Sequence, residues 1–262
     1  MFSDLISTVI LFVCGLFGGL FLGLGMGTTG AVLITAMTVF LGYSIHYAIG
    51  TSLLVDCIIG GVAGVIYFSQ HRTNFRPALL MAGTGAFGSF IGSQFTSRAP
   101  AISLLILLSI LLIAFGISFV RSGLRRNLEV IGDTIRVHRF KKHVTLVLGG
   151  TGLFAGIASG FTGVGVGGVV VTTLILILEY DLTTAIGTAL LCLVFISGFG
   201  ALGHAFHNEI IYPVVLIACS GAAIGAITGS LIATKINEER LGQIIGVILI
   251  IMGILLTLRI FQ

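Results

Sequence analysis

The sequence is dominated by continuous apolar runs, several of them long enough to cross a membrane. Of the 262 residues, 56% are hydrophobic and only 8% are charged, whereas charged residues make up about a quarter of an ordinary soluble domain. A soluble chain of this length would leave most of its surface in water, and that surface would need more charge. Because the runs are continuous and do not alternate, they predict an all-α integral membrane protein rather than a barrel.

Two of the runs, residues 5–41 and 144–178, exceed the roughly 20 residues of one spanning helix. Each contains a string of closely spaced glycines, at residues 23–30 and 160–168. Glycine in a helix interior is destabilising, so we expect a spanning helix followed by a short, broken or re-entrant one in each run. The other runs are close to bilayer length and cover residues 48–68, 77–95, 101–120, 185–206, 213–233 and 241–260.

The two halves of the chain match each other at one spacing. The Ile-Gly-Thr element at residues 49–51 recurs at residues 186–188, an offset of 137 residues. The same offset superposes further small residues: Gly23 on Gly160, Gly30 on Gly167, Gly92 on Gly229, Ser93 on Ser230 and Gly116 on Gly253. This agreement predicts an internal duplication, with a first transmembrane repeat at residues 1–120 and a second at residues 144–262.

A connector at residues 121–143 joins the two predicted repeats. It holds seven of the thirteen Lys and Arg residues, so the positive-inside rule predicts that it is cytoplasmic in a multi-pass protein of the cell membrane. We therefore interpret the net charge of +4 as topogenic, and expect no nucleic-acid partner. Charge counting allows four or five segments per repeat, eight to ten in total. We favour five, in inverted repeats with glycine-broken helices at their interface, because glycine breaks shorten helices.

The paired glycine strings and the Ile-Gly-Thr elements form the candidate substrate site. At a helix break, backbone amides and the positive end of a half-helix converge, and they can bind an anion without a buried cationic side chain. No Lys or Arg lies well inside an apolar run, so we expect a small anionic substrate between the repeats. The candidate substrate-binding residues are Gly25, Gly27, Thr28, Thr29, Gly30, Gly50, Thr51, Ser52, Thr162, Gly163, Gly165, Gly167, Gly168, Gly187 and Thr188.

Glycines elsewhere have a different interpretation, because small residues also allow close packing of membrane helices. We favour that packing role for Gly85, Gly88, Gly92, Gly221, Gly225 and Gly229. The four cysteines are scattered singly without a CxxC pair, so we expect neither a metal site nor a cofactor.

Two ionisable residues are candidates for proton or ion coupling. Asp56 is the only carboxylate well inside an apolar run, and an intramembrane acid typically serves as a proton relay or cation ligand. A structural hydrogen bond to a neighbouring helix is the alternative. Its counterpart at the 137-residue offset is Leu193, so its role would be asymmetric. His204 lies near the end of its run and is either a protonatable gate or a packing histidine.

The duplicated glycine strings, Ala-Ile-Gly-Thr elements and glycine ladders around a basic connector resemble the TauE/SafE family of sulfite and organosulfonate exporters. The resemblance covers essentially the whole chain. It implies a secondary transporter of sulfite, sulfoacetate or related anions in a prokaryotic plasma membrane. The family often has a proline soon after each glycine string, whereas this chain has Thr35 and residues 172–173 (Thr-Thr) there.

Combining the resemblance with the duplication, we expect export by alternating access, coupled to protons, in a chain that contacts the lipid bilayer and can form a homo-oligomer. A passive anion channel with the same filter is the main alternative. An intramembrane enzyme is a further alternative, built from Ser197, Asp56 and His204. Because no HExxH or GxSxG pattern places these residues, we expect no catalytic site and no enzymatic activity.

Overall fold

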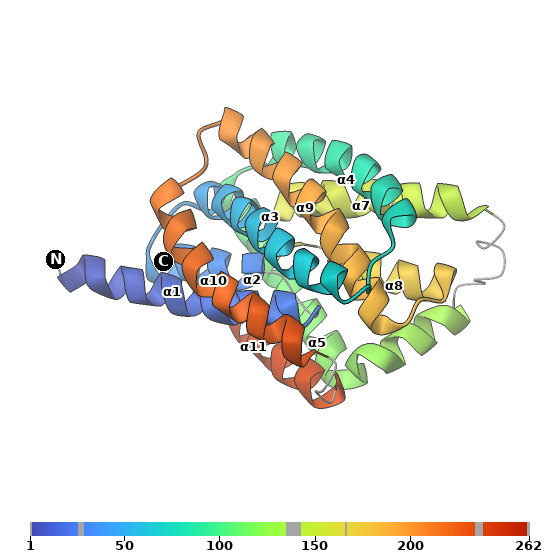
Figure 1. Cartoon of the computed structure of the whole chain (residues 1–262). Coiled ribbons are helices and arrows are strands. Elements are labelled where there is room, and N and C mark those ends of the chain that lie inside the picture. The colour runs from blue at the N-terminus through green and yellow to red at the C-terminus, as the bar shows by residue number, and fades with distance from the viewer. Residues whose placement is uncertain (1, 26–28, 135–142, 166, 234–237, 261–262) are drawn as a thin grey trace.

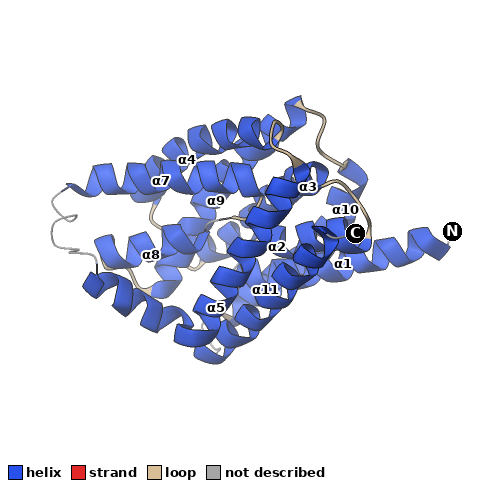
Figure 2. Cartoon of the chain, turned by 180° about the vertical axis from the view of Figure 1, so that it is seen from behind, coloured by secondary structure: helices blue, strands red, loops and turns tan. Residues whose placement is uncertain are grey.

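The computed structural model describes the chain except for residues 1, 26–28, 135–142, 166, 234–237 and 261–262. Its described part contains ten α-helices and one π-helix, η1, and no strand (Figure 2). This confirms the all-α prediction. The helices are α1 (Phe2–Gly23), α2 (Thr29–Thr35), η1 (Ala36–Phe40), α3 (Ile45–Ser69), α4 (Phe75–Thr96), α5 (Ala101–Thr134), α7 (Val144–Thr162), α8 (Gly167–Leu178), α9 (Leu182–Phe206), α10 (Tyr212–Ile232) and α11 (Glu238–Ile260).

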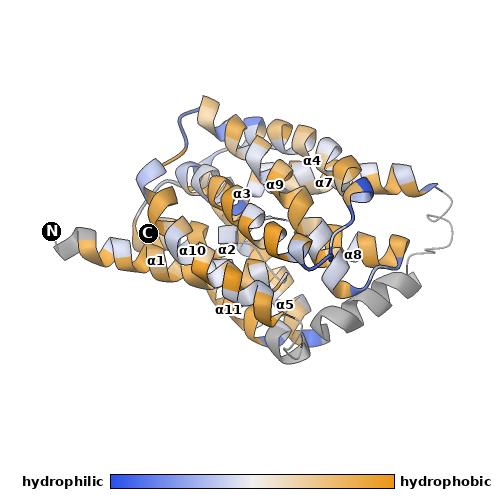
Figure 3. Ribbon diagram, viewed as in Figure 1, coloured by the Kyte–Doolittle hydropathy of each residue, from blue (hydrophilic) through white to orange (hydrophobic). Residues whose placement is uncertain are grey.

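Seven of the described helices are long and apolar enough to cross a membrane, namely α1, α3, α5, α7, α9, α10 and α11. Their outer surfaces carry large exposed apolar side chains, such as Leu146, Phe206 and Leu216, as a lipid-facing surface requires. Hydrophilic residues gather in connections such as the one between α3 and α4 (Figure 3). The chain is therefore a multi-pass membrane protein. The candidate span in α5 ends at Arg121, where the predicted connector begins.

Helices α3 and α9 form the centre of the molecule. They are the most deeply buried of the spans and pack against each other. Three helix pairs surround them: α1 with α10, α4 with α7, and α5 with α11. Figure 1 shows α3 and α9 lying between the α4/α7 pair and the α5/α11 pair. Each outer pair thus combines one helix from each half of the chain.

Contacts between the halves follow the 137-residue offset. The hydroxyl of Thr51 in α3 accepts a hydrogen bond from the amide of Ile211 at 3.0 Å. The hydroxyl of Thr188 in α9 accepts one from the amide of Asn74 at 3.1 Å. Thr188 lies 137 residues after Thr51, and Ile211 lies 137 residues after Asn74, so the offset relates the two hydrogen bonds to each other. These reciprocal contacts support the duplication, which stays a prediction, as do the repeat boundaries and the inverted arrangement.

Glycines allow α4 and α7 to approach until their backbones touch. A Cβ atom at Gly156 would overlap the carbonyl oxygen of Gly85, and one at Gly88 would overlap that of Leu153. The α1/α10 pair has the same arrangement, in which Gly221 meets the carbonyl of Phe12. The predicted packing role is confirmed for all six of the glycines assigned to it, Gly85, Gly88, Gly92, Gly221, Gly225 and Gly229, each of which closely approaches a neighbouring backbone.

Two alanine substitutions on the same helix test this packing. Gly156→Ala should lower the free energy of unfolding by about 1–3 kcal/mol, because the methyl group overpacks the α4/α7 contact. Gly150→Ala is the matched control, since a Cβ there meets no atom within 4 Å, and it should be neutral or stabilise by up to about 1 kcal/mol. Reversible unfolding in mixed micelles measures both, and equal effects would contradict the packing assignment.

Candidate functional site

Both glycine strings break the helix, as predicted. Helix α1 ends at Gly23 and α2 begins at Thr29, while α7 ends at Thr162 and α8 begins at Gly167. Gly163 follows α7 with φ of 70°, and Gly25 follows α1 with φ of 73°. This left-handed conformation is strained for any residue with a Cβ, so it explains glycine at these two positions. Two candidate site residues, Gly27 and Thr28, lie outside the described residues.

The two breaks meet inside the bundle. Gly30 at the start of α2 packs directly against the carbonyl oxygen of Gly163 at the end of α7. The hydroxyl of Ser52 in α3 donates to the same Gly163 carbonyl at 3.3 Å and to the Ile49 carbonyl at 2.8 Å. Reciprocal apolar contacts support the junction, because a Cβ at Gly163 would contact Ile49. Gly25 is packed in the same way against Ile186, which stands at the 137-residue offset from Ile49.

Asp56 lies at this junction, one turn of α3 beyond Ser52. It is fully buried, and a Cβ built on Gly30 would lie 3.3 Å from its Oδ2 atom. Its carboxylate faces the hydroxyl and amide of Thr29 and the amide of Gly30 at the start of α2, although none of these contacts has full hydrogen-bond geometry. The structural alternative for Asp56, a hydrogen bond to a neighbouring helix, stays a prediction. We call Thr29, Gly30, Ser52, Asp56 and Gly163 the break cluster.

Three of the candidate hydroxyls, those of Thr51, Thr162 and Thr188, have structural hydrogen-bond partners. Thr51 and Thr188 hold the opposite loops, as described above, and Thr188 also donates to the Thr184 carbonyl at 2.7 Å. Thr162 donates to the Ala158 carbonyl at 2.7 Å and accepts from the Val164 amide at 3.3 Å. Gly50 and Gly187 pack against the backbone carbonyls of Glu209 and Arg72, within these loops. Thus the glycine and threonine of each Ile-Gly-Thr element contact the loop of the opposite half, whereas Ile49 packs against Gly163 of the break cluster.

The start of α8 has more space than the start of α2. A Cβ at Gly167 or Gly168 would meet no atom within 4 Å. Gly167 borders a small apolar pocket whose other lining residues come from α7, α8 and α9: Ala155, Val170, Ala189, Leu193 and Ile196. Leu193, the counterpart of Asp56, lines this pocket. The first break therefore adjoins a carboxylate, whereas the second adjoins an apolar wall.

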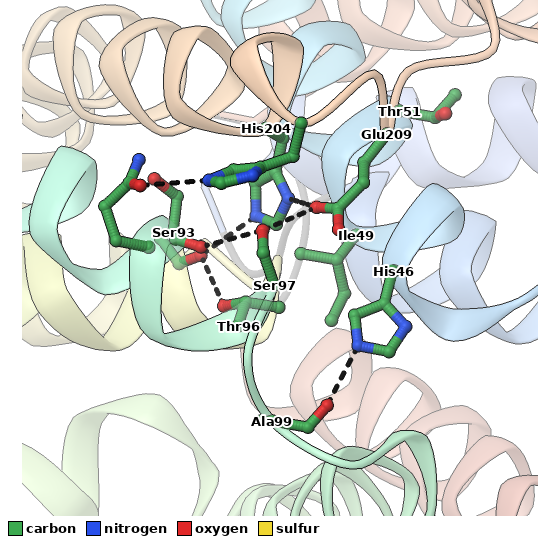
Figure 4. Close-up of polar contacts among 12 residues, drawn as sticks. His46, Ile49, Thr51, Ser93, Thr96, Ser97, Ala99, His204 and Glu209 are labelled. Atoms are coloured by element: carbon green, nitrogen blue, oxygen red, sulfur yellow. Dashed lines mark hydrogen bonds and ion pairs between the residues drawn. The ribbon is translucent and has the colours of Figure 1, made fainter.

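His204 lies in the last turn of α9 and joins it to the end of α7. Its side chain is fully buried, with Nδ1 2.6 Å from Oε2 of Glu209 and Nε2 3.3 Å from the Gly160 carbonyl oxygen. Figure 4 shows Ser97 converging on the same carboxylate, to which its hydroxyl donates at 2.9 Å. Because a carboxylate and a carbonyl can only accept, we assign His204 as the imidazolium, which donates to both. His204 is thus both a packing residue and one half of an ion pair.

A tyrosine occupies the equivalent place in the first half. Tyr67, at the 137-residue offset from His204, donates its hydroxyl to the Gly23 carbonyl at 3.0 Å. Gly23 in turn corresponds to Gly160. Each helix that precedes a break is therefore held at its end by an aromatic side chain of α3 or α9, and only the second of these side chains can be charged.

Sequence reasoning missed three of these polar residues: Tyr67, Ser97 and Glu209. Tyr67 could have been found from the 137-residue offset, which places it on His204. Glu209 lies five residues after His204, in a connection that resembles an ordinary solvated loop. Its pairing depends on the turn that follows α9, where the Glu209 amide donates to the His204 carbonyl at 3.0 Å. Ser97 carries no sequence signal that we can identify.

The Glu209 carboxyl has a lowered pKa. Burial alone would raise it, but hydrogen bonds from His204 and Ser97 and the positive charge of His204 outweigh burial and hold the pKa below its ordinary value of 4.5. A carboxyl whose pKa is lowered on folding stabilises the fold above its unfolded pKa, and this contribution is lost as the pH falls through the folded pKa.

Replacing Glu209 tests the ion pair. Glu209→Gln should lower the free energy of unfolding near neutral pH by about 1–3 kcal/mol, because a charge-assisted hydrogen bond is lost. The difference in the free energy of unfolding between Glu209→Gln and the unsubstituted protein should shrink as the pH is lowered below about 4.5. Unfolding of the purified protein across this pH range measures both effects. In a double-mutant cycle with His204→Gln the two losses should not add, and full additivity would rule out the pairing.

The described part of the chain brings together no group of three or more His, Cys, Asp or Glu side chains that could hold a metal ion. What it does contain is a helical membrane bundle with two facing helix breaks in its interior, the architecture of secondary transporters. Residues 11–256 match the family model described as "Sulfite exporter TauE/SafE". The chain therefore belongs to the TauE/SafE family of membrane transporters.

Relatives with similar names match over most of their length. The chain is 25% identical over 243 residues to a "Probable membrane transporter protein" of Xylella fastidiosa (strain Temecula1 / ATCC 700964), covering 90% of this chain and 89% of that protein. It is 24% identical over 228 residues to the "Probable membrane transporter protein YdhB" of Bacillus subtilis (strain 168), covering 85% and 87% of the two chains. No solved structure matches the chain.

Proposed function

We propose that this protein is a secondary transporter that exports sulfite or a related organosulfonate or sulfur oxyanion across the cell membrane by alternating access. The observation that carries the proposal is the meeting of the two glycine breaks between the two halves of the bundle. Transporters with repeated halves commonly bind their substrate where discontinuous helices of the two repeats face each other. The family name supports sulfite as the first anion to test.

The second break is the better place for the anion. The first amides of an α-helix have no partner within the helix and lie at its positive end. Helix α8 begins at Gly167, and both Gly167 and Gly168 leave open space beside them. At the first break, by contrast, the Asp56 carboxylate would repel an anion. We therefore place the anion against Gly167 and Gly168, at the start of α8.

Coupling residues complete the proposal. Asp56 is the candidate for the coupling ion because it is a buried carboxylate beside the break cluster, and His204 is the candidate gate because its ion pair with Glu209 holds the end of α7. The basic connector at residues 121–143 is proposed to face the cytoplasm. Since the chain belongs to a family of transporters, we propose transport rather than catalysis.

Leucine at Gly167 tests the anion site. Gly167→Leu should abolish sulfite flux in proteoliposomes, because the side chain fills the space beside the α8 amides. It should leave the melting temperature nearly unchanged, since a Cβ at this position meets no atom within 4 Å. Gly83→Leu is the matched control, because Gly83 is exposed on α4 and also has no atom within 4 Å of an added Cβ.

The outcome of this assay also separates a transporter from a channel. A secondary transporter should accumulate sulfite against its gradient when a proton or cation gradient is imposed, whereas a channel should only equilibrate it. Undiminished flux through Gly167→Leu would show that the anion does not pass the second break. Flux that never exceeds equilibrium under any ion gradient would exclude secondary transport.

A further inference from the structure

Buried oxygen atoms gather at the first break. Both carboxylate oxygens of Asp56 and the hydroxyl of Thr29 are buried and make no hydrogen bond of full geometry among the described residues. The carboxylate does face the Thr29 hydroxyl and the amides of Thr29 and Gly30, but no cationic side chain. Leaving a buried carboxylate unpaired is costly, and a buried charge normally has a partner or binds a metal ion. No salt bridge to Lys, Arg or His links Asp56 to the described part of the chain. A positively charged ligand would satisfy these groups.

The Asp56 carboxylate and the Gly163 carbonyl both lie beside Gly30. A Cβ atom built there would lie 3.3 Å from Oδ2 of Asp56 and would also touch the carbonyl oxygen of Gly163. The Ser52 hydroxyl lies 3.3 Å from this carbonyl oxygen, and Ser52 precedes Asp56 by four residues, on the same face of α3. The Thr29 hydroxyl faces the Asp56 carboxylate. Three kinds of oxygen, from four residues, thus lie near the junction: a carboxylate, two hydroxyls and a main-chain carbonyl.

The Gly163 carbonyl adds a second source of negative potential. It lies just past the last residue of α7, at the end where the helix dipole is negative. In membrane transporters, unwound carbonyls and the C-terminal ends of broken helices coordinate coupling cations. The left-handed cap at Gly163 turns this carbonyl away from continued helix and towards Gly30 and Ser52. The break cluster, where the two breaks meet, therefore favours a cation, although the start of α8 favours an anion.

We propose that Asp56, Thr29, Ser52 and the carbonyl of Gly163 form a binding site for Na⁺. All of the donors are hard oxygens, which suit an alkali or alkaline-earth cation rather than a transition metal. The cluster contributes a single negative charge, from Asp56, so a monovalent cation neutralises it, whereas a divalent cation would leave a net charge in the bilayer interior. The site is asymmetric, because Leu193 replaces the carboxylate in the second half of the chain.

This inference rests on the proposed function, because it identifies the coupling ion of the same transporter. Bound Na⁺ would neutralise Asp56, so the carboxylate would no longer repel an anion at the second break. The contact between Gly30 and Gly163 holds this break against the cluster. Cation and anion would then stabilise each other's binding, a coupling that must be reciprocal. Sodium, rather than the proton, would therefore drive or accompany sulfite movement.

The test is thermal unfolding of the purified full-length protein in detergent, without sulfite, at constant ionic strength. NaCl should raise the melting temperature with a saturable dose response relative to choline chloride, because a ligand that binds the folded state stabilises it. The melting temperatures in KCl and MgCl₂ test the selectivity of the site for Na⁺ over K⁺ and Mg²⁺. Asp56→Asn should remove the sodium-dependent shift, and Ser52→Ala should raise the half-saturating Na⁺ concentration about tenfold, since a lost ligand to a charged group costs at least about 1.4 kcal/mol.

Matched variants keep the test decisive. Ser230→Ala removes another buried hydroxyl, one whose only assigned bond is to the Ala226 carbonyl of its own helix at 2.7 Å, and it should leave the Na⁺ response unchanged. If Asp56→Asn fails to fold, Ser52→Ala and Thr29→Val decide the question. Equal melting temperatures in NaCl and choline chloride would overturn the proposal, as would a sodium shift that survives Asp56→Asn. Stabilisation that follows pH alone would assign the site to a proton instead.

Sulfite flux separates this inference from the proposed function. Proteoliposomes should move sulfite faster under a sodium gradient than under an equal choline gradient. Sulfite flux without any sodium effect on flux or melting would refute the cation site and leave the transporter intact. A sodium-dependent melting shift in a protein that moves no sulfite under any gradient would refute the proposed function and leave the cation site intact.

Discussion

The close approach of helix backbones through glycine is the constraint on which the rest of the structure depends. Lipid supplies no hydrophobic force between helices, so their association relies on packing and on polar contacts. In the α4/α7 and α1/α10 pairs the glycines let one backbone touch the next, and each pair joins the two halves of the chain. These pairs hold the ends of α1 and α7 in the interior. Without them the two breaks would not face each other beside α3 and α9.

The central helices α3 and α9 position the residues of the candidate site. Residues near the start of α3 and of α9 hold the opposite loops through Thr51 and Thr188, while residues further along reach the breaks. Tyr67 and His204 contact carbonyls in the last turn of the helix before each break. The framework is thus nearly symmetric, and the two halves differ at a few polar positions. Two such differences are Asp56 opposite Leu193, and His204 with Glu209 opposite Tyr67.

Much of the fold could be predicted from the sequence because the bilayer leaves few alternatives. Continuous apolar runs indicated the helices, and glycine strings in the two overlong runs indicated the breaks. The site was harder to predict. The Ile-Gly-Thr motif predicts substrate-site residues at Gly50, Thr51, Gly187 and Thr188. In the structure these residues contact the opposite loops, which the sequence does not indicate because the direction in which a helical residue points depends on packing. Glu209 was missed for a related reason: a glutamate in a connection gives no sign that a turn will direct it onto a buried histidine.

The asymmetry of the two breaks has a consequence for how the ions could be coupled. A bilayer interior penalises net charge, so a site that bound only an anion would be expensive to occlude. The start of α8 offers helix amides beside an apolar pocket, and the break cluster offers a carboxylate, hydroxyls and a carbonyl at the negative end of α7. Because Gly30 and Gly163 are in contact, a cation on Asp56 would lie close to the anion and would remove the repulsion that the bare carboxylate exerts on it. The anion would then be occluded at lower cost with a cation or a proton on Asp56 than beside the bare carboxylate. This electrostatic dependence would couple the anion to the proposed cation, without a long-range pathway between distant sites.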